Sequence, residues 1–289
     1  MHFCISLNAL RKRMPQSEPL FTIITVCRNA AESLWLTASS VLEQNIPEHF
    51  SVEYIIVDGA SSDSTPQVLK RIEEACGQKV LLRIVSEPDN GIYDAMNKGT
   101  RMSSGQLLCF LNAGDIFAQT DVLARVAEVQ CSKHADVYYG SVIKKLDFGL
   151  VETKPRPLEM LQRKMAFCHQ SAFIRRETLI DHPYNLDYRL TADYEFFYCC
   201  YRNGKEMYDM GFPVVVFESE KGASSRNRLL MNREYARING RYSSFSWWLE
   251  YIGKCLEVGF NNVWRALSPT ALVDKIRKKI YERKSSSRG

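Results

Sequence analysis

The first 110 residues alternate short apolar runs with longer amphipathic segments. Short apolar runs are typical of buried strands, whereas apolar positions spaced three and four apart are typical of helices that cover a sheet. The predicted strands are 21–27, 54–57, 80–85 and 107–111, and the helices between them are 30–44, 66–75 and 92–102. Because alternating strands and helices are joined by right-handed crossovers, this order predicts an α/β fold with a mostly parallel sheet.

The middle of the chain, up to about residue 228, mixes the two periods. We predict helices at 121–129, 157–164 and 193–203, and strands at 137–143, 171–174 and 214–217. No internal repeat is visible. Residues 20–228 are therefore expected to form one α/β domain, preceded by a poorly ordered leader at 1–19.

From residue 229 onward the pattern changes to amphipathic helices with a basic side. Apolar residues line one face of 248–263 and of a second helix at 272–280, where lysine and arginine fill other positions. Residues 221–289 contain 15 Lys/Arg and 5 Asp/Glu, a net charge of +10, which leaves −5 for 1–220. We expect 229–289 to be an amphipathic helical extension that lies on an anionic membrane surface, or else packs on the core or a homodimer partner.

The remaining composition is that of a soluble protein of 289 residues with 45% hydrophobic content. Nine cysteines without a Cys-x-x-Cys pair favour a reducing cytoplasm and no structural zinc. No segment approaches the ~20 apolar residues of a membrane span, and the leader lacks the apolar core of a signal peptide. The expected location is the cytoplasm, peripheral to the inner membrane.

A first candidate ligand, Asp58, follows the apolar run 54–57 and opens the turn 58–65. The carboxyl ends of parallel strands form the ligand-binding edge of such a sheet. A carboxylate there can accept the imide N–H of a base such as uracil. A turn or helix-cap role is the structural alternative for Asp58 and the expected role of Asp63.

Asp115 follows the run 107–111 at the same edge, in the turn Asn112-Ala113-Gly114-Asp115. Transfer of a sugar from a nucleoside diphosphate leaves a diphosphate, whose added charge a divalent ion can offset. Mg²⁺ and Mn²⁺ prefer hard oxygen ligands. Asp115 is thus a metal candidate, although an ordinary turn at a strand end has the same pattern.

Two helix starts carry further candidates. The turn at Asp89 leads into helix 92–102, whose N-terminus suits an anionic diphosphate, so Asp89 and Asn97 are candidate donor contacts. Asp193 opens helix 193–203, where a carboxylate can deprotonate an acceptor hydroxyl. The alternatives are a capping role for Asp89, a solvated Asn97, and a first-turn acid at 193 that the helix dipole favours.

Weaker candidates for contacts with acceptor or phosphate are His169, Gln170, Ser224 and Arg226. A buried core histidine is an equally good interpretation of His169. The loop 222–226 has the small and polar residues of a mobile loop that closes over a diphosphate, but a solvated linker has them too.

Taken together, these segments resemble the inverting family 2 glycosyltransferases of the GT-A fold, and most of all those that build bacterial exopolysaccharide, capsule or O-antigen units. The resemblance covers about residues 20–225. It rests on the segments 23–29, 57–63, 89–99, 110–115 and 192–193. It implies a Rossmann-like sheet flanked by helices.

With the position of each residue, the resemblance gives a set of expected roles. The residues expected to bind the nucleotide sugar are Val26, Cys27, Arg28, Asp58, Asp89, Asn97, Asn112 and Gly114. Asp115 is expected to hold Mn²⁺ or Mg²⁺, and Asp193 is expected to be the catalytic base. Acids 58, 115 and 193 should then converge around one bound diphosphate.

The chain departs from the usual family pattern at several motif positions. Arg28 replaces an aromatic residue, Gly59 a second aspartate, Met96 an arginine, Asn112 and Gly114 two metal-motif acids, and Ala192 a glutamate. Asp115 is left as the one carboxylate of the metal motif.

The function expected from the resemblance is transfer of a sugar, from UDP by preference, to a lipid-diphosphate-linked saccharide in bacterial surface polysaccharide synthesis. The depleted acidic motif motivates an alternative, a non-catalytic sugar-nucleotide-binding or scaffold subunit. A nucleotidyltransferase is a weaker possibility, because the first strand is not followed by a glycine-rich basic loop. Without Gly-x-Gly-x-x-Gly, a P-loop or a nucleic-acid recognition module, dinucleotide enzymes, ATPases and nucleic-acid partners are not expected.

Overall fold

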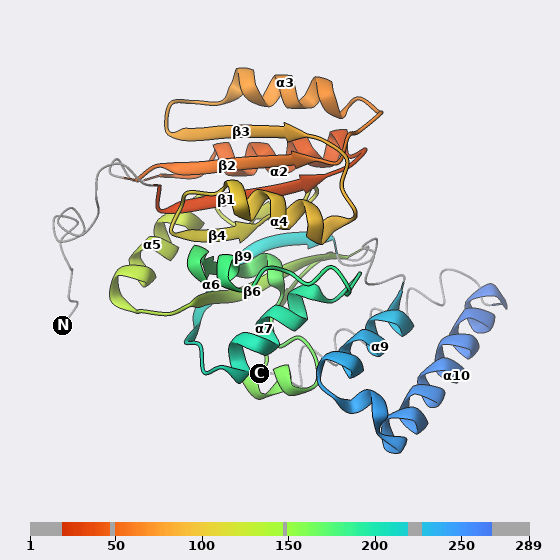
Figure 1. Cartoon of the computed structure of the whole chain (residues 1–289). Helices are drawn as coiled ribbons and strands as arrows, with labels where there is room; N and C mark the ends of the chain where they lie inside the picture. The colour runs from red at the N-terminus through yellow and green to blue at the C-terminus, as the bar shows by residue number, and fades with distance from the viewer. Residues whose placement is uncertain (1–18, 47–49, 147–148, 219–226, 268–289) are drawn as a thin grey trace.

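The computed structural model of the chain describes residues 19–46, 50–146, 149–218 and 227–267. Nine strands of this part form one sheet (Figure 1). They are β1 (Phe21–Cys27), β2 (Val52–Asp58), β3 (Val80–Ser86), β4 (Leu107–Phe110), β5 (Ile116–Phe117), β6 (Val137–Leu146), β7 (Gly149–Thr153), β8 (Ala172–Arg175) and β9 (Met207–Glu218). The sheet order is β3-β2-β1-β4-β8-β6-β9-β5, and β7 pairs with β6.

The first four strands are parallel, as the sequence predicts, and their carboxyl ends meet at one edge. The register pairs Cys27 with Asp58 and Asp58 with Ser86. Beyond β4 the sheet is mixed, because β8 runs antiparallel to both β4 and β6, whereas β9 runs parallel to β6. The predicted mostly parallel α/β sheet is confirmed.

Helices cover both faces of the sheet. The described helices are α2 (Ala31–Leu42), α3 (Thr65–Ala75), α4 (Ile92–Met102), α5 (Val122–Ser132), α6 (Arg176–Asp181), α7 (Ala192–Arg202), α9 (Arg228–Ile238) and α10 (Phe245–Leu267), of which α2 to α7 lie against the sheet. Three short 3₁₀ turns are η1 (Leu158–Gln162), η2 (His169–Ser171) and η3 (Arg241–Ser243).

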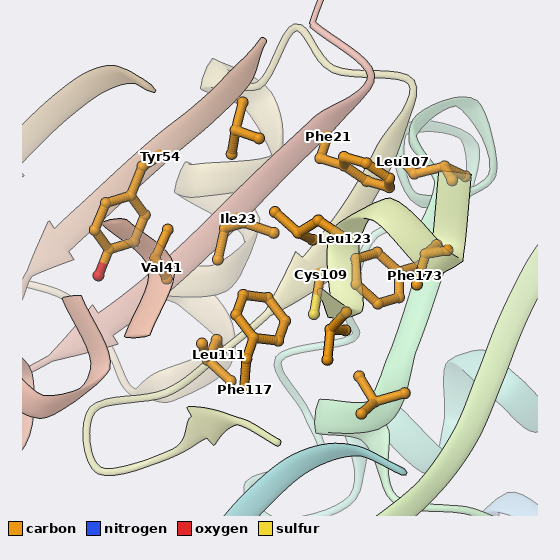
Figure 2. Close-up of a cluster of buried hydrophobic side chains, with 14 of the residues drawn as sticks. Phe21, Ile23, Val41, Tyr54, Leu107, Cys109, Leu111, Phe117, Leu123 and Phe173 are labelled. Atoms are coloured by element: carbon orange, nitrogen blue, oxygen red, sulfur yellow. The ribbon is translucent and has the colours of Figure 1, made fainter. Parts of the chain in front are cut away.

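Each face of the sheet has its own apolar core, because successive side chains of a strand point to opposite faces. Ile23 packs with residues of α2, α3 and α5, and Figure 2 shows part of this cluster around Ile23, Tyr54 and Phe173. Ile24 packs instead with residues of α4, α6 and α7. Burial on both faces explains why β1 and β2 read as continuous apolar runs in the sequence.

The structure corrects several predicted boundaries. β9 begins at Met207, well before the predicted start at 214, and the predicted helix 157–164 is the 3₁₀ turn η1. The short elements β5, β7 and α6 were not predicted. They are too short to show a clear hydrophobic period.

The C-terminal extension begins with α9, which packs on α7 through the rings of Tyr235 and Tyr194, 4.4 Å apart. α10 lies on the outer side of α9 (Figure 1). The predicted helix 272–280 and residues 1–18 of the predicted leader 1–19 lie outside the described residues. Among the described residues, no helix is both long and apolar enough to cross a membrane.

Candidate active site

A cavity of about 770 Å³ opens at the carboxyl edge of the sheet, and both Asp115 and Asp193 line it. Its walls come from the loop after β4, from η2, from the start of α7 and from α9. The volume is that of a typical small-molecule site. Two of the three predicted acids therefore share one cavity, although 78 residues separate them in the chain.

The turn that carries Asp115 is shaped by Thr37, a fully buried residue of α2. Its hydroxyl donates to the backbone oxygen of Asp115 at 2.8 Å and accepts the N–H of Gly114 at 2.9 Å. Gly114 has φ +104°, a conformation that side chains of L residues disfavour. This accounts for glycine at the position where the resemblance leads one to expect an acid.

Asp115 is a buried carboxylate, and no described cation forms an ion pair with it. Burial raises its pKa from 3.8 to about 7, and a hydrogen bond from the Gln170 side chain opposes the rise only in part. In the same cavity, the side-chain oxygen of Asn112 is buried and has no hydrogen-bond partner. Two hard oxygen ligands that lack a positive partner fit a divalent cation.

Asp193, the second acid of the cavity, is held by a residue of α4. The Tyr93 hydroxyl donates to Oδ1 of Asp193 at 2.7 Å. The other oxygen, Oδ2, lies 3.8 Å from Nδ1 of His169, too far for a hydrogen bond. One carboxylate oxygen is therefore fixed by Tyr93, and the other is available to a ligand in the cavity.

His169, which lies between Asp115 and Asp193 in the sequence, also lines the cavity and is 7% exposed. Burial lowers its pKa, so the imidazole is neutral near pH 7. Its Nε2 atom is buried without a hydrogen-bond partner. A neutral ring with one unpartnered nitrogen can accept a hydrogen bond from a hydroxyl group or donate one to an oxygen.

Known proteins with related sequences identify the family of this chain. The sequence profile of "Glycosyl transferase family 2" matches residues 22–189, more than half of the chain. The chain belongs to glycosyl transferase family 2. A PGL/p-HBAD biosynthesis glycosyltransferase of Mycobacterium bovis is 31% identical over 225 residues, which cover 76% of this chain and 83% of the relative. An uncharacterized glycosyltransferase of Mycobacterium tuberculosis is 32% identical over 186 residues, 62% of this chain and 68% of the relative.

Solved structures of glycosyltransferases share the fold. The mannosyltransferase PcManGT from Pyrobaculum calidifontis, in complex with GDP-Man and Mn2+, superposes with a TM-score of 0.62 at 18% identity, over 95% of this chain and 85% of that one. S. aureus TarS in complex with UDP-GlcNAc gives a TM-score of 0.58 at 15% identity, over 77% and 71% of the two chains. The protein is thus a glycosyltransferase with a GT-A fold, as the sequence predicts.

The third predicted acid of the glycosyltransferase, Asp58, does not line the cavity. It is fully buried at the end of β2, and its two oxygens accept hydrogen bonds from the backbone N–H and hydroxyl of Ser61 and from the hydroxyl of Ser86 at 2.6 Å. The thiol of Cys27 adds a longer contact of 3.8 Å. Asp58 therefore organises the turns after β2 and β3, and its carboxylate is occupied in this structure.

Gly59, Asp89 and Arg28 meet beside this turn. A side chain at position 59 would collide with the Asp89 carboxylate and touch Arg28. The space that a second aspartate would need is thus filled by Asp89, which comes from a different loop. Asp89 also accepts the N–H of Gly91 at 2.9 Å, which closes the turn before α4.

The other predicted site residues have different surroundings in the structure. Val26 and Cys27 end β1 almost fully buried, and burial raises the pKa of the Cys27 thiol to about 12, so this thiol is not a nucleophile near pH 7. The amide of Asn97 is used structurally: it donates to the Tyr184 carbonyl at 2.8 Å and accepts the Tyr184 N–H at 3.0 Å. Gln170 lines the cavity. Ser224 and Arg226 lie outside the described residues.

Helix α9 supplies site residues that the sequence analysis assigned to a separate extension. Tyr235 lines the cavity. The buried carboxylate of Glu234 accepts the N–H groups of Arg189 and Leu190, both at 3.0 Å, and the Thr191 hydroxyl at 2.8 Å. It thereby fixes the segment just before Asp193. A glutamate inside an amphipathic helix gives no sequence signal of this role.

Proposed function

We propose that the protein is an inverting glycosyltransferase that moves a sugar from a nucleotide sugar, UDP-linked by preference, to a lipid-linked saccharide acceptor. The proposed setting is surface polysaccharide synthesis at the cytoplasmic face of a bacterial inner membrane. The observation that carries the proposal is the shared cavity of Asp115 and Asp193, in which Asn112 and His169 present unpartnered buried atoms.

The donor would lie along the carboxyl edge of the sheet and cross the ends of several strands. The nucleoside would lie over the turns after β1 and β2, near Arg28 and the Asp58 turn, and the diphosphate would lie at the loop after β4. Neighbouring strands are about 4.8 Å apart, so β2 and β4, two strands apart, are about 10 Å apart. That distance fits the reach from a base to its diphosphate.

Asp115 and Asn112 would hold the divalent ion, Mn²⁺ or Mg²⁺, with one carboxylate and one amide oxygen. When bound, the ion would offset the charge that builds up on the leaving diphosphate. Only one acid contributes to this site, so most of the ligands would come from the donor phosphates and water, an arrangement common for Mg²⁺.

Asp193 would take the proton of the acceptor hydroxyl through its available oxygen, Oδ2, while Tyr93 holds Oδ1. The acceptor oxygen then bonds to the anomeric carbon as the bond from that carbon to the diphosphate oxygen breaks. Attack opposite to the leaving group inverts the anomeric centre. His169 would face a sugar hydroxyl with its unpartnered Nε2.

The proposed lipid attachment of the acceptor is supported by α10. Its residues Phe245, Leu249, Ile252 and Leu256 recur every three or four positions and are all more than half exposed. An apolar stripe on the exposed face of a surface helix suits a membrane interface.

The glycosyl-transfer part of the proposal is tested with a panel of UDP- and GDP-sugars, in Mn²⁺, Mg²⁺ or EDTA, with saccharide acceptors on short lipid diphosphates. We expect one UDP-sugar to dominate, loss of activity in EDTA, and a product whose anomeric configuration by NMR is opposite to that of the donor. A retained configuration would contradict the mechanism. Binding of a nucleotide sugar with no turnover on any acceptor would favour a non-catalytic subunit.

The membrane part is tested separately by co-sedimentation with vesicles of phosphatidylglycerol. The variant Leu249→Asp/Ile252→Asp should lose binding at least fivefold, whereas Glu250→Gln on the same helix should keep it. Sedimentation equilibrium of the same proteins distinguishes the alternative, since a double variant that changes only a dimer equilibrium would assign the stripe to a homodimer.

A further inference from the structure

The cavity of this glycosyltransferase carries far more positive than negative charge. Its lining contains two acids, Asp115 and Asp193, but five bases. The bases are Lys144, Lys154, Arg156, Arg189 and Arg228. One divalent ion at Asp115 would add further positive charge, so the cavity as a whole suits ligands with several negative charges.

The bases come from β6, from the segment after β7 and from the starts of α7 and α9, none of which belongs to the β1–β4 half of the sheet. Lys144 is on β6, Lys154 and Arg156 follow β7, Arg189 precedes α7, and Arg228 opens α9. In the sheet order, β4 is followed by β8 and β6. β7 pairs with β6 beyond the end of β8, on the edge of β6 opposite β9, so it too lies on the side of β4 away from β1 and β2.

Three of these cations have no competing acid among the described residues. No ion pair joins Lys154, Arg189 or Arg228 to a carboxylate in this part of the chain. The backbone of Arg189 is fixed by the Glu234 carboxylate at 3.0 Å, and Arg228 is the first residue of α9. The side chains of Arg189 and Arg228 thus start from two anchored segments of the cavity wall.

We propose that Lys154, Arg189 and Arg228 form a phosphate-binding subsite for the acceptor, which accordingly carries a phosphate or diphosphate next to its saccharide. This inference rests on the proposed function and adds to it the residues that bind the phosphate of the acceptor. The saccharide hydroxyl would lie at Asp193, between the donor at Asp115 and the acceptor phosphate at the three cations. Apolar lining residues Met231 and Tyr235 on α9 would contact the first part of the lipid.

The donor diphosphate is a poorer occupant for these cations. It must lie within reach of the metal ion and of the nucleoside site on β1 and β2. Lys154 follows β7, a neighbour of β6 on the side of β4 away from β1 and β2, and Arg189 and Arg228 come from the starts of α7 and α9. A membrane headgroup is a poorer occupant too, because these residues line a concave cavity and the exposed apolar stripe lies on α10.

The test measures binding of geranyl diphosphate to the enzyme that is already saturated with UDP and Mn²⁺, so that the donor phosphate site is filled. Geraniol is the uncharged control ligand. Arg189→Ala and Arg228→Ala should each weaken geranyl diphosphate binding about fivefold or more, and the double variant further, because each removes a charge-assisted contact. Lys70→Ala, an exposed lysine of α3 outside the cavity, is the matched control and should change nothing.

Three outcomes would overturn the subsite. The first is equal binding of geranyl diphosphate by the double variant and the wild type. The second is a loss of UDP affinity in the arginine variants, which would assign the cations to the donor. The third is loss of phosphatidylglycerol vesicle binding with unchanged geranyl diphosphate binding. If the wild-type protein itself fails to bind UDP with Mn²⁺, it is the proposed function that fails.

Discussion

Replacing Asp115 with asparagine should stabilise the metal-free protein at pH 8. The same substitution should abolish the rise in melting temperature that Mn²⁺ with UDP causes in the wild type. The folded protein holds a carboxyl whose pKa burial raises from 3.8 to about 7. Between these two values, the folded state keeps a proton that the unfolded chain has released. The cost to stability therefore grows as the pH rises from 4 and is complete above about pH 7.

The size of the effect follows from the same two values. The interval between 3.8 and about 7 corresponds to about 4 kcal/mol above pH 7, an upper limit because the site can relax. We expect asparagine to recover about 1–3 kcal/mol, since it carries no charge and retains an oxygen for the Gln170 side chain. For a chain of this size that is about 2–6 °C in melting temperature. At pH 4 the gain should be close to zero.

The assay is thermal and urea unfolding of both proteins in EDTA at pH 4, 6 and 8, with Asp187→Asn as an exposed carboxylate control. Mn²⁺ with UDP should then raise the melting temperature of the wild type but not of the variant, because bound ligand stabilises only a protein that binds it. A variant that is less stable at pH 8, or whose gain does not depend on pH, would refute the burial argument.

Three further substitutions test individual contacts. Tyr93→Phe removes the hydroxyl that holds Asp193, so kcat should fall about tenfold at constant donor KM. An unchanged kcat would make Tyr93 a packing residue. Glu234→Ala leaves three hydrogen-bond donors without their acceptor and should lower the free energy of unfolding in urea by about 2–4 kcal/mol. The exposed Glu250→Ala should lower it by less than about 1 kcal/mol. Asn97→Ala should lower the melting temperature without changing the donor KM, and an increased KM would return Asn97 to donor binding.

The parallel half of the fold could be predicted from the sequence because strands buried on both faces appear as continuous apolar runs. Phe21–Cys27 and Ile92–Met102 begin and end where the hydrophobic pattern predicts. The mixed half was harder, since β8 runs antiparallel to β4 and β6 and the strand order in the sheet departs from the order in the chain. No local pattern indicates which strand pairs with which.

For the site, the sequence predicted the acids but not their neighbours. Asp115 and Asp193 follow apolar runs or open helices, which is a local signal. Thr37 and Glu234 act through backbone atoms distant in the chain, and such contacts leave no trace in one sequence. For Asp58 the pattern predicted the correct edge of the sheet, but it did not indicate the hydrogen bonds that the carboxylate accepts from Ser61 and Ser86.

The central claim, that Asp193 is the base which acts on an acceptor in the cavity it shares with Asp115, is tested most directly by the kcat of Asp193→Asn. Loss of a general base costs about 10²–10⁴-fold, and the amide retains the shape of the side chain. The account predicts a fall of that size in kcat while the dissociation constant of UDP with Mn²⁺ stays within about twofold of the wild type. A variant that keeps more than about a tenth of wild-type kcat would contradict it.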